Sequence, residues 1–198
     1  MVKARIAVLV SGGGTNLQAL IDAQKSGIIK SGKITLVVSN KKDAYALTRA
    51  ENAGIKTAVI EKKGNPNFES DITALLKAEG IDIIVLAGFM CILSESFTKQ
   101  FENRILNVHP SLIPSFCGEG FYGLRVHEAA LNYGVKVTGA TVHFVNEIPD
   151  GGKIILQKAV SIEENDTPET LQKRVMEQAE WIILPQAVEI VSKNYIKE

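Results

Sequence analysis

The sequence predicts an α/β fold: an open, mostly parallel, twisted sheet with helices on both faces, of the Rossmann-like kind, and an antiparallel addition near the C-terminus. Three observations support this. Short apolar runs alternate with helical patterns along the chain, and most of the helical patterns end at a glycine. Beyond residue 135 the alternation stops, and two strand-like runs follow each other across a short turn. The 198 residues are expected to form a single domain.

The first half of the chain is expected to supply the parallel strands. RIAVLV (5–10) is a continuous apolar run, which is typical of a strand buried on both faces. The segment 15–27 places Leu17, Leu20 and Ile21 at helical spacing and ends at a glycine. The same alternation predicts further strands at 33–40, 56–60, 81–89 and 104–110, and helices at 43–54, 67–80 and 93–101.

The second half begins with a long loop and ends with a long helix. The predicted order is loop, helix, strand and strand, at 111–123, 124–134, 136–146 and 153–160. The two strands flank EIPDGG, so they are expected to pair as a hairpin, antiparallel to the rest of the sheet. Loops as long as 111–123 are usually functional. The last helix is expected over 167–194, with Thr167 as its N-cap and Pro185 as a kink or break.

Composition excludes several classes of partner. Lys and Arg number 22, and so do Asp and Glu, so the overall charge predicts neither nucleic acid nor an anionic membrane as a partner. The two cysteines, Cys91 and Cys117, form no CxxC motif, which favours free thiols in a reducing compartment and a cytoplasmic protein. No apolar run approaches the length of a membrane span, and the N-terminal run is too short for a secretory leader.

A glycine-rich turn joins the first strand to the first helix. In VSGGGTNLQ (10–18), three glycines let the backbone approach a ligand, and the helix start offers free N–H groups that suit a phosphate. A dinucleotide motif GxGxxG fails at Leu17, and the P-loop motif is absent. The turn therefore indicates a phosphate monoester. The alternative is a tight strand–helix turn, with Thr15 or Asn16 as the helix cap.

Polar side chains end the strand expected at 104–110. Asn107 and His109 lie two residues apart, so they share one face of the strand. Asparagine is a neutral donor and protonated histidine a charged one, and together they can hold an oxyanion as it forms on a carbonyl. Asp150, in a nearby loop, is expected to raise the pKa of His109 above its usual value of about 6.5 and keep it charged. These groups suit acyl transfer between two bound substrates.

Other interpretations of these residues remain open. The three histidines lack the short spacing of compact zinc sites, so no metal is expected. A Ser–His–Asp hydrolase would need GxSxG, which does not occur. His127 is expected to be structural or to support the site rather than to be catalytic, whereas His143 is either a supporting residue or a buried histidine. Strand-end and turn roles alone are alternatives for Asn107 and Asp150.

Four segments resemble the folate-dependent formyltransferase family: VSGGGTNLQALID, VLAGFM, LNVHPSLIPSF and GATVHFVNEIPDGGKIILQ. The resemblance extends from about residue 5 to 190, and the SGGGTNLQ loop points to members that act on glycinamide ribonucleotide. It implies transfer of a formyl group from 10-formyltetrahydrofolate to the amine of that ribonucleotide in purine synthesis. It also implies that Asn107 and His109 hold the tetrahedral oxyanion and that Asp150 sets the charge of His109.

The resemblance further implies which residues bind each substrate. For the ribonucleotide it implies a phosphate site at Gly13, Gly14, Thr15 and Asn16, and Glu180 at the ribose or amine end. For the folate it implies Phe89, Met90, Cys91, Ile92, Leu93, Asn107, Val145, Asn146 and Glu147, with Thr141 and His143 as supporting residues. Residues 1–100 would form the ribonucleotide-binding half of the single domain and 101–198 the folate-binding and catalytic half. A homodimer is compatible with the family.

The sequence departs from the family pattern at two folate positions. KKGNPNFES lacks the arginine that some members carry before the third helix, and Cys91 stands where many members have arginine. Three other functions are alternatives. A formyltetrahydrofolate deformylase would carry an extra N-terminal domain, and a methionyl-tRNA formyltransferase a C-terminal RNA-binding domain; neither is expected here. A non-catalytic phosphate-binding module would explain the glycine loop but not the polar constellation.

Overall fold

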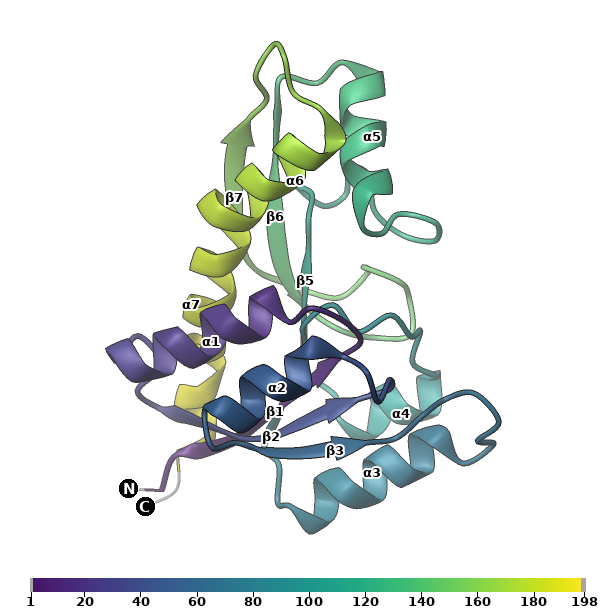
Figure 1. The fold of residues 1–198 in the computed structure, drawn as a ribbon, viewed down its shortest axis with the longest axis vertical. Helices are drawn as coiled ribbons and strands as arrows, with labels where there is room; N and C mark the ends of the chain where they lie inside the picture. The colour runs from purple at the N-terminus through teal and green to yellow at the C-terminus, as the bar shows by residue number, and fades with distance from the viewer. Residues whose placement is uncertain (1, 197–198) are drawn as a thin grey trace.

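A seven-stranded sheet forms the centre of the protein, as the computed structural model describes it for residues 2–196 (Figure 1). Its strand order is β3-β2-β1-β4-β5-β6-β7. The strands are β1 Ala4–Val10, β2 Gly32–Ser39, β3 Lys56–Val59, β4 Ile83–Leu86, β5 Ile105–His109, β6 Val137–Phe144 and β7 Ile154–Ser161. The predicted fold class and all seven predicted strands are therefore confirmed.

Strand β6 runs opposite to the other six strands of the sheet. β1 pairs in parallel with both β2 and β4, and β4 pairs in parallel with β5. β6 runs antiparallel to β5, and β7 antiparallel to β6, as the hairpin pattern predicted. Because the chain leaves β1 toward β2 on one side and returns as β4 on the other, a crevice opens at the carboxyl ends of these strands. Open α/β sheets bind their ligands at such a point.

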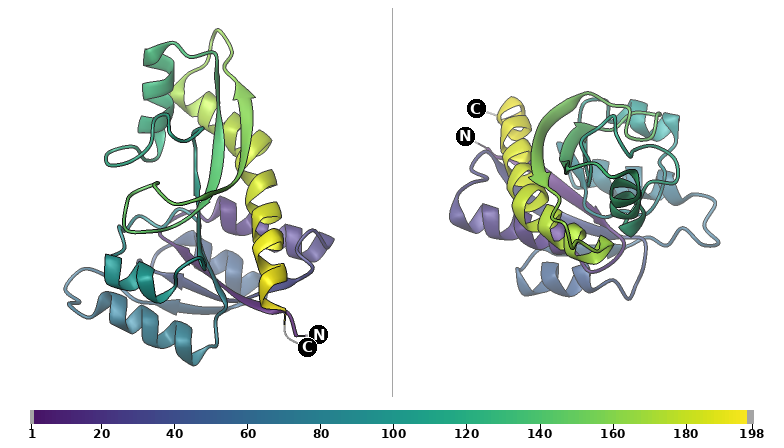
Figure 2. Two further views of the ribbon diagram at one scale, coloured as in Figure 1. Left: turned by 180° about the vertical axis from the view of Figure 1, so that it is seen from behind. Right: turned by 90° about the horizontal axis from the view of Figure 1, so that it is seen from above.

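Helices cover both faces of the sheet (Figure 2). They are α1 Thr15–Ser26, α2 Tyr45–Asn52, α3 Phe68–Ala78, α4 Glu95–Gln100, α5 Leu124–Tyr133, α6 Pro168–Val175 and α7 Trp181–Ser192. In β1, Ile6, Val8 and Val10 pack with α1, α2, α6 and α7, whereas Ala7 and Leu9 pack with α3 and α4. Each fully buried Ile, Val or Leu side chain contributes roughly 1.5–3 kcal/mol. The continuous apolar run thus reflects burial on both faces.

The predicted C-terminal helix is interrupted. Thr167 is the N-cap, as predicted, and its hydroxyl accepts a hydrogen bond from the backbone N–H of Thr170 at 3.3 Å. A π-helical turn at Met176–Glu180 separates α6 from α7, and a short 3₁₀ turn, Lys193–Tyr195, follows α7. Pro185 lies inside α7 rather than at the break. Proline removes a single backbone donor, and the helix continues through it. The kink or break predicted at Pro185 is therefore wrong as a break, and the observed break lies upstream, at the π turn.

Two predicted strands end earlier than expected. The apolar run 81–89 yields only β4, because Gly88 adopts a left-handed backbone conformation (φ 69°) and turns the chain out of the sheet. The run 136–146 yields β6, which ends at Phe144. In both cases the residues beyond the strand line a cavity described below. The residues that follow β4 and β6 thus form part of the cavity wall rather than of the sheet.

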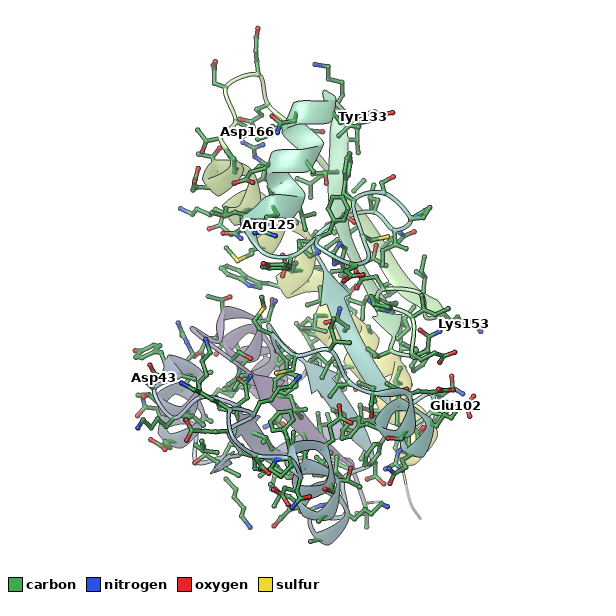
Figure 3. All side chains as sticks on the ribbon, turned by 90° about the vertical axis from the view of Figure 1, so that its right-hand side faces the viewer. Asp43, Glu102, Arg125, Tyr133, Lys153 and Asp166 are labelled. Carbon is green, nitrogen blue, oxygen red and sulfur yellow. The ribbon has the colours of Figure 1, made fainter. Side chains whose placement is uncertain are left out.

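The loop between β7 and α6 is fixed by charge. Asp166, labelled in Figure 3, accepts hydrogen bonds from Arg174 of α6 on both carboxylate oxygens, and its Oδ1 also accepts one from the Thr170 hydroxyl at 2.9 Å. The hydrogen bond from Arg174 lowers the pKa of Asp166 to about 2.

Within residues 2–196, no helix is both long enough and apolar enough to cross a bilayer.

Candidate active site

A cavity of about 830 Å³ lies at the carboxyl ends of β1, β4 and β5. Most of the predicted site residues line it: Asn16, Phe89, Met90, Cys91, Ile92, Leu93, Asn107, His109, His143, Val145, Asn146, Glu147, Asp150 and Glu180. Four predicted residues do not: Gly13, Gly14, Thr15 and Thr141. The size is that of a small-molecule site. The fold thus brings together residues from positions 16 to 180 of the chain.

Asn107 is oriented by the neighbouring antiparallel strand. In the register between β5 and β6, it lies directly opposite His143. Nδ1 of His143 lies 2.8 Å from the carbonyl oxygen of Phe144, which can only accept, so that nitrogen carries a proton. Nε2 lies 3.3 Å from Nδ2 of the Asn107 amide and 3.5 Å from Oδ1 of Asp150, so it faces both groups. A side-chain amide has two N–H groups, so one N–H of Asn107 remains for a ligand.

His109 lies between a backbone carbonyl and a carboxylate. Its Nε2 donates a hydrogen bond to the carbonyl oxygen of Phe116 at 2.9 Å, and its Nδ1 lies 3.4 Å from Oδ2 of Asp150. Burial lowers the pKa of His109, and the opposing effects of Asp150 and the Phe116 carbonyl do not compensate. The prediction that the carboxylate raises this pKa above its usual value is therefore wrong for the free protein. Desolvation of a nearly buried imidazole outweighs one neighbouring charge.

Asp150 is placed by a strained turn. Its φ is 56°, a left-handed conformation that aspartate tolerates better than most residues. Oδ2 accepts a hydrogen bond from the backbone N–H of Gly118 at 2.9 Å, and Oδ1 lies 3.5 Å from Nε2 of His143. Burial alone would raise the pKa of Asp150, but His143, His109 and the Gly118 amide together lower it. Asp150 is therefore ionised at neutral pH and faces both histidines.

Thr141 lies behind the cavity wall. It is directly opposite His109 in the β5–β6 register and is fully buried. Its hydroxyl donates to the carbonyl oxygen of Ser111 at 2.7 Å and accepts from the backbone N–H of Ile113 at 3.1 Å. Thr141 thus holds the chain that leaves His109, and it has no access to a ligand.

Three glycines turn the chain from β1 into α1. Gly14 is the N-cap of α1 with φ 73°, and no side chain caps this helix, so capping by Thr15 or Asn16 does not occur. A Cβ atom on Gly14 would lie 2.6 Å from Cβ of Ala46 in α2. Gly12 and Gly13 have no other atom within 4 Å of such a Cβ. Only the third glycine is therefore required by the fold.

Replacing Gly14 by alanine should destabilise the protein by roughly 2–4 kcal/mol, because left-handed strain and the clash with Ala46 add. Gly12→Ala is the matched control, and it should change stability by less than roughly 1 kcal/mol. Urea unfolding of both variants measures the difference. Equal effects of the two substitutions would contradict the assignment.

Glu180 is a buried carboxyl at the end of the π turn. Its Oε2 accepts a hydrogen bond from Nδ2 of Asn16 at 2.8 Å. Burial raises its pKa from 4.5 to about 7, against the smaller effect of Asn16. Gln172 and Met176, which precede it by two steps of four residues, also line the cavity. Four residues are more than one α-helical turn of 3.6 residues but fewer than one π turn of roughly 4.4 residues. The step from Gln172 to Met176 therefore rotates past a full turn, the step from Met176 to Glu180 falls short of one, and the three side chains stay on one side of the helix.

Stability should fall with rising pH because of Glu180. At low pH the carboxyl is protonated in both states; between about 4.5 and 7 only the unfolded state releases its proton, so unfolding becomes easier. Glu180→Gln should therefore gain stability relative to the wild-type protein as pH rises, by up to roughly 3 kcal/mol above pH 7. Urea unfolding at pH 5.5 and pH 8 measures this difference. A difference that does not change with pH would contradict the raised pKa.

His127, for which a structural or supporting role was predicted, lines the cavity. It is completely buried in the first turns of α5, and neither ring nitrogen has a hydrogen-bond partner among residues 2–196. Burial, with a smaller effect of nearby His109, lowers its pKa to about 4, so it is neutral at pH 7. Gln172 and Met176 were not predicted. Their spacing of four before Glu180 was the available signal.

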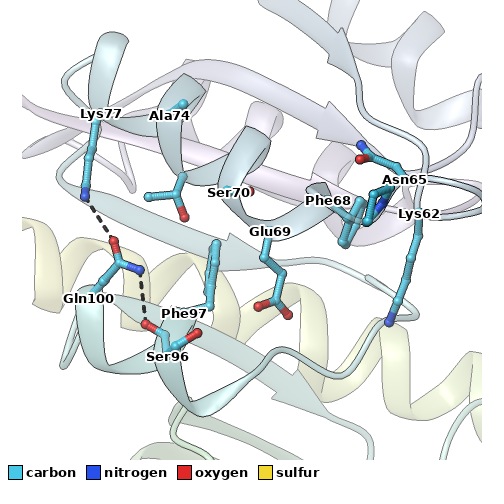
Figure 4. A pocket seen from close by; sticks show the side chains of 12 residues that line it. Lys62, Asn65, Phe68, Glu69, Ser70, Ala74, Lys77, Ser96, Phe97 and Gln100 are labelled. Carbon is cyan, nitrogen blue, oxygen red and sulfur yellow. Dashed lines mark hydrogen bonds between the residues drawn. The ribbon is translucent and has the colours of Figure 1, made fainter.

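A second cavity of about 720 Å³ lies between α3 and α4 (Figure 4). Nζ of Lys77 donates to Oε1 of Gln100 at 3.0 Å across it, and Nζ of Lys62 lies 5.9 Å from the centre of the Phe68 ring. None of the predicted site residues lines this cavity.

No group of three or more His, Cys, Asp or Glu side chains within residues 2–196 is arranged to hold a metal ion.

Comparison with known proteins places this geometry in a family. The formyl transferase family matches residues 4–188. Phosphoribosylglycinamide formyltransferase of Haemophilus influenzae is 46% identical over 196 residues, which cover 98% of this chain and 89% of that protein. The human trifunctional purine biosynthetic protein adenosine-3 is 48% identical over 198 residues, 98% of this chain. The chain spans about a fifth of the length of that trifunctional protein, since the match covers 19% of it.

Solved structures agree over almost the whole chain. Glycinamide ribonucleotide transformylase 1 from Symbiobacterium toebii superposes with a TM-score of 0.90 at 41% identity, covering 97% of this chain and 89% of that one. Phosphoribosylglycinamide formyltransferase from Brucella melitensis superposes with a TM-score of 0.87 at 40% identity, covering 96% of both chains. With a family match over residues 4–188 and relatives this similar in sequence and in structure, the chain belongs to the formyl transferase family.

Proposed function

We propose that this protein transfers the formyl group of 10-formyltetrahydrofolate to the amine of glycinamide ribonucleotide, a reaction of purine biosynthesis. One observation carries the proposal. Asn107 and His109 face one cavity from a single strand, Asp150 lies beside His109, and Asn16 and Glu180 line the same cavity. This gives one site with both oxyanion donors and polar groups for a second substrate. The names of the relatives supply the ribonucleotide and the formyl group, and the folate donor is what the family implies.

In the proposed reaction, the amine nitrogen attacks the formyl carbon and a tetrahedral intermediate forms with its charge on the former carbonyl oxygen. The free N–H of Asn107 and Nε2–H of His109 would hold that oxygen. In the free protein the carbonyl of Phe116 accepts the His109 proton at 2.9 Å, so this hydrogen bond must be exchanged for one to the substrate. The developing negative charge would also raise the pKa of His109 and favour its charged form.

Proton transfer completes the proposed reaction. The attacking amine loses one proton, and the folate nitrogen gains one as its bond to the formyl carbon breaks. Asp150 is ionised and touches both His109 and His143, so it is the group placed to stabilise the imidazolium and to relay the proton through water. Contributions of this kind are typically worth ~10²–10⁴ in rate.

The two substrates would enter from different sides of the cavity. The folate ring would lie in the apolar part, against residues 89–93 and the loop 145–150, and the ribonucleotide would extend past Glu180 to the glycine loop. The first hundred residues would thus supply most of the phosphate contacts, and the remainder the catalytic groups. Two exceptions to this division are Glu180, which lies in the second part but would bind the ribonucleotide, and residues 89–93, which lie in the first part but would bind the folate.

A formyl-transfer assay with 10-formyltetrahydrofolate, with and without glycinamide ribonucleotide and in the presence of a chelator, tests the proposal. Release of tetrahydrofolate only with the ribonucleotide present is the expected result. Release of free formate without it would mean a deformylase. No release under either condition would favour a binding module and leave the Asn107–His109 pair unexplained.

A further inference from the structure

Helix α2 holds the glycine loop from outside the cavity. The backbone N–H of Ala46 donates to the carbonyl oxygen of Gly12 at 3.0 Å, and Nε of Arg49 donates to the carbonyl oxygen of Gly13 at 2.8 Å. Two consecutive carbonyl groups of the loop therefore point toward α2. The contact is close, because a Cβ atom on Gly14 would also meet Ala46.

The direction of these carbonyl groups fixes the direction of the next amides. In a trans peptide the N–H of one residue points opposite to the C=O of the residue before it. Since the carbonyls of Gly12 and Gly13 face α2, the N–H groups of Gly13 and Gly14 face away from it. Neither N–H has an acceptor among residues 2–196. Arg49 thus determines the orientation of the amide of Gly14.

Arg49 is itself held in place. Its Nη1 donates to Oε1 of Gln18 in α1 at 3.1 Å, and its guanidinium lies 5.0 Å from the centre of the Tyr45 ring. None of the ion pairs found within residues 2–196 involves Arg49. The helix N-terminus of α1 and this unpaired cation therefore lie together at the loop, and both favour an anion.

We propose that Arg49 is the positioning residue of the phosphate site: through Gly13, it turns the Gly14 N–H toward the phosphate and adds an uncompensated positive charge behind the loop. This rests on the proposed function, because it takes the phosphate of the ribonucleotide as the occupant. Arg49 does not line the cavity, so it acts through the peptide and through its charge.

Three variants separate these effects. Arg49→Met keeps much of the side-chain length but loses both the donors and the charge. Arg49→Lys keeps the charge but loses the guanidinium group that bonds Gly13 and Gln18 at the same time. Lys42→Met removes an exposed cation from the turn before α2. Arg49→Met should raise KM for the ribonucleotide roughly 10- to 100-fold, as for loss of a charge-assisted hydrogen bond, with little change in kcat. Arg49→Lys should lie between Arg49→Met and the wild-type protein, and Lys42→Met should resemble the wild-type protein.

The phosphate itself is tested with pairs of ligands. The riboside that lacks the phosphate should react equally well with Arg49→Met and wild-type protein, and calorimetry should show that ribose 5-phosphate loses affinity for the variant. An unchanged KM for the ribonucleotide would overturn the inference. So would an equal rise of KM for ribonucleotide and riboside, since that indicates general distortion, which the unfolding temperature would also report. If the wild-type protein binds ribose 5-phosphate through Arg49 but transfers no formyl group, the proposed function fails and this inference stands.

Discussion

Replacing His109 by alanine should lower kcat for formyl transfer about 10²–10³-fold, because the variant lacks one of the two donors to the developing oxyanion. KM for both substrates should change little, since the donor acts on a charge that exists only in the transition state. Steady-state kinetics with both substrates varied measure the two effects separately. The imidazole is buried, but it borders an existing cavity, so its loss should leave the fold intact.

His109→Gln is the matched variant for this experiment. Glutamine retains a neutral N–H donor of similar reach but cannot become charged, so its kcat should lie between alanine and the wild-type protein. The unfolding temperature of both variants serves as the control for folding. A loss of less than about fivefold in kcat for alanine would contradict the oxyanion role, because single donors of this kind contribute far more.

Replacing Asp150 by asparagine should lower kcat by ~10²–10⁴, the usual contribution of proton transfer. Asparagine suits this position because it tolerates the left-handed backbone (φ 56°) that Asp150 adopts. Burial lowers the pKa of His109 and the carboxylate opposes that effect, so losing the carboxylate should lower this pKa further. The charged form of His109 would then exist only at more acidic pH.

NMR titration of the His109 imidazole in wild-type protein and in Asp150→Asn tests the sign directly. The titration midpoint should move to lower pH in the variant, and the alkaline limb of kcat against pH, where His109 loses its proton, should move with it. Asp150→Ala is a less suitable variant because it adds backbone strain at a positive φ. A midpoint that rises in Asp150→Asn would show that the carboxylate does not act on His109 as the geometry indicates.

The strands were predictable because their signal is local. Five consecutive apolar residues in β1 are enough to indicate burial on both faces. In β5, Asn107 and His109 are two residues apart, and side chains at this spacing lie on the same face of a strand. The ends of β4 and β6 were not predictable, because neither strand ends at a change in hydrophobicity. After β4 a left-handed glycine turns the chain, and after both strands the following residues line the cavity. The break in the C-terminal helix was expected at Pro185, the strongest local signal, but lies at the π turn.

The site was only partly predictable. Asn107 and His109 followed from residue type and spacing, whereas the substrate-binding role of Glu180 depended on resemblance, because nothing in its own neighbourhood distinguishes it. The lowered pKa of His109 was missed because burial depends on what packs around the ring, and the sequence shows only the nearby carboxylate. Arg49 was missed for a similar reason: its contact with Gly13 joins residues 36 apart in sequence.

The antiparallel pairing of β5 with β6 has a consequence for how the protein loses activity. Asn107 and His143 face each other across a ladder in the interior of a seven-stranded sheet, and Thr141 fixes the chain beyond His109 from the same ladder. Such strands open only when the whole domain melts, whereas loops open locally at little cost. Warming should therefore release Asp150, which stands on a loop, well before it disturbs the donor pair. Activity would therefore be lost first by reversible opening of the loop that carries Asp150. The sheet and the Asn107–His109 pair would remain folded, so activity would return on cooling.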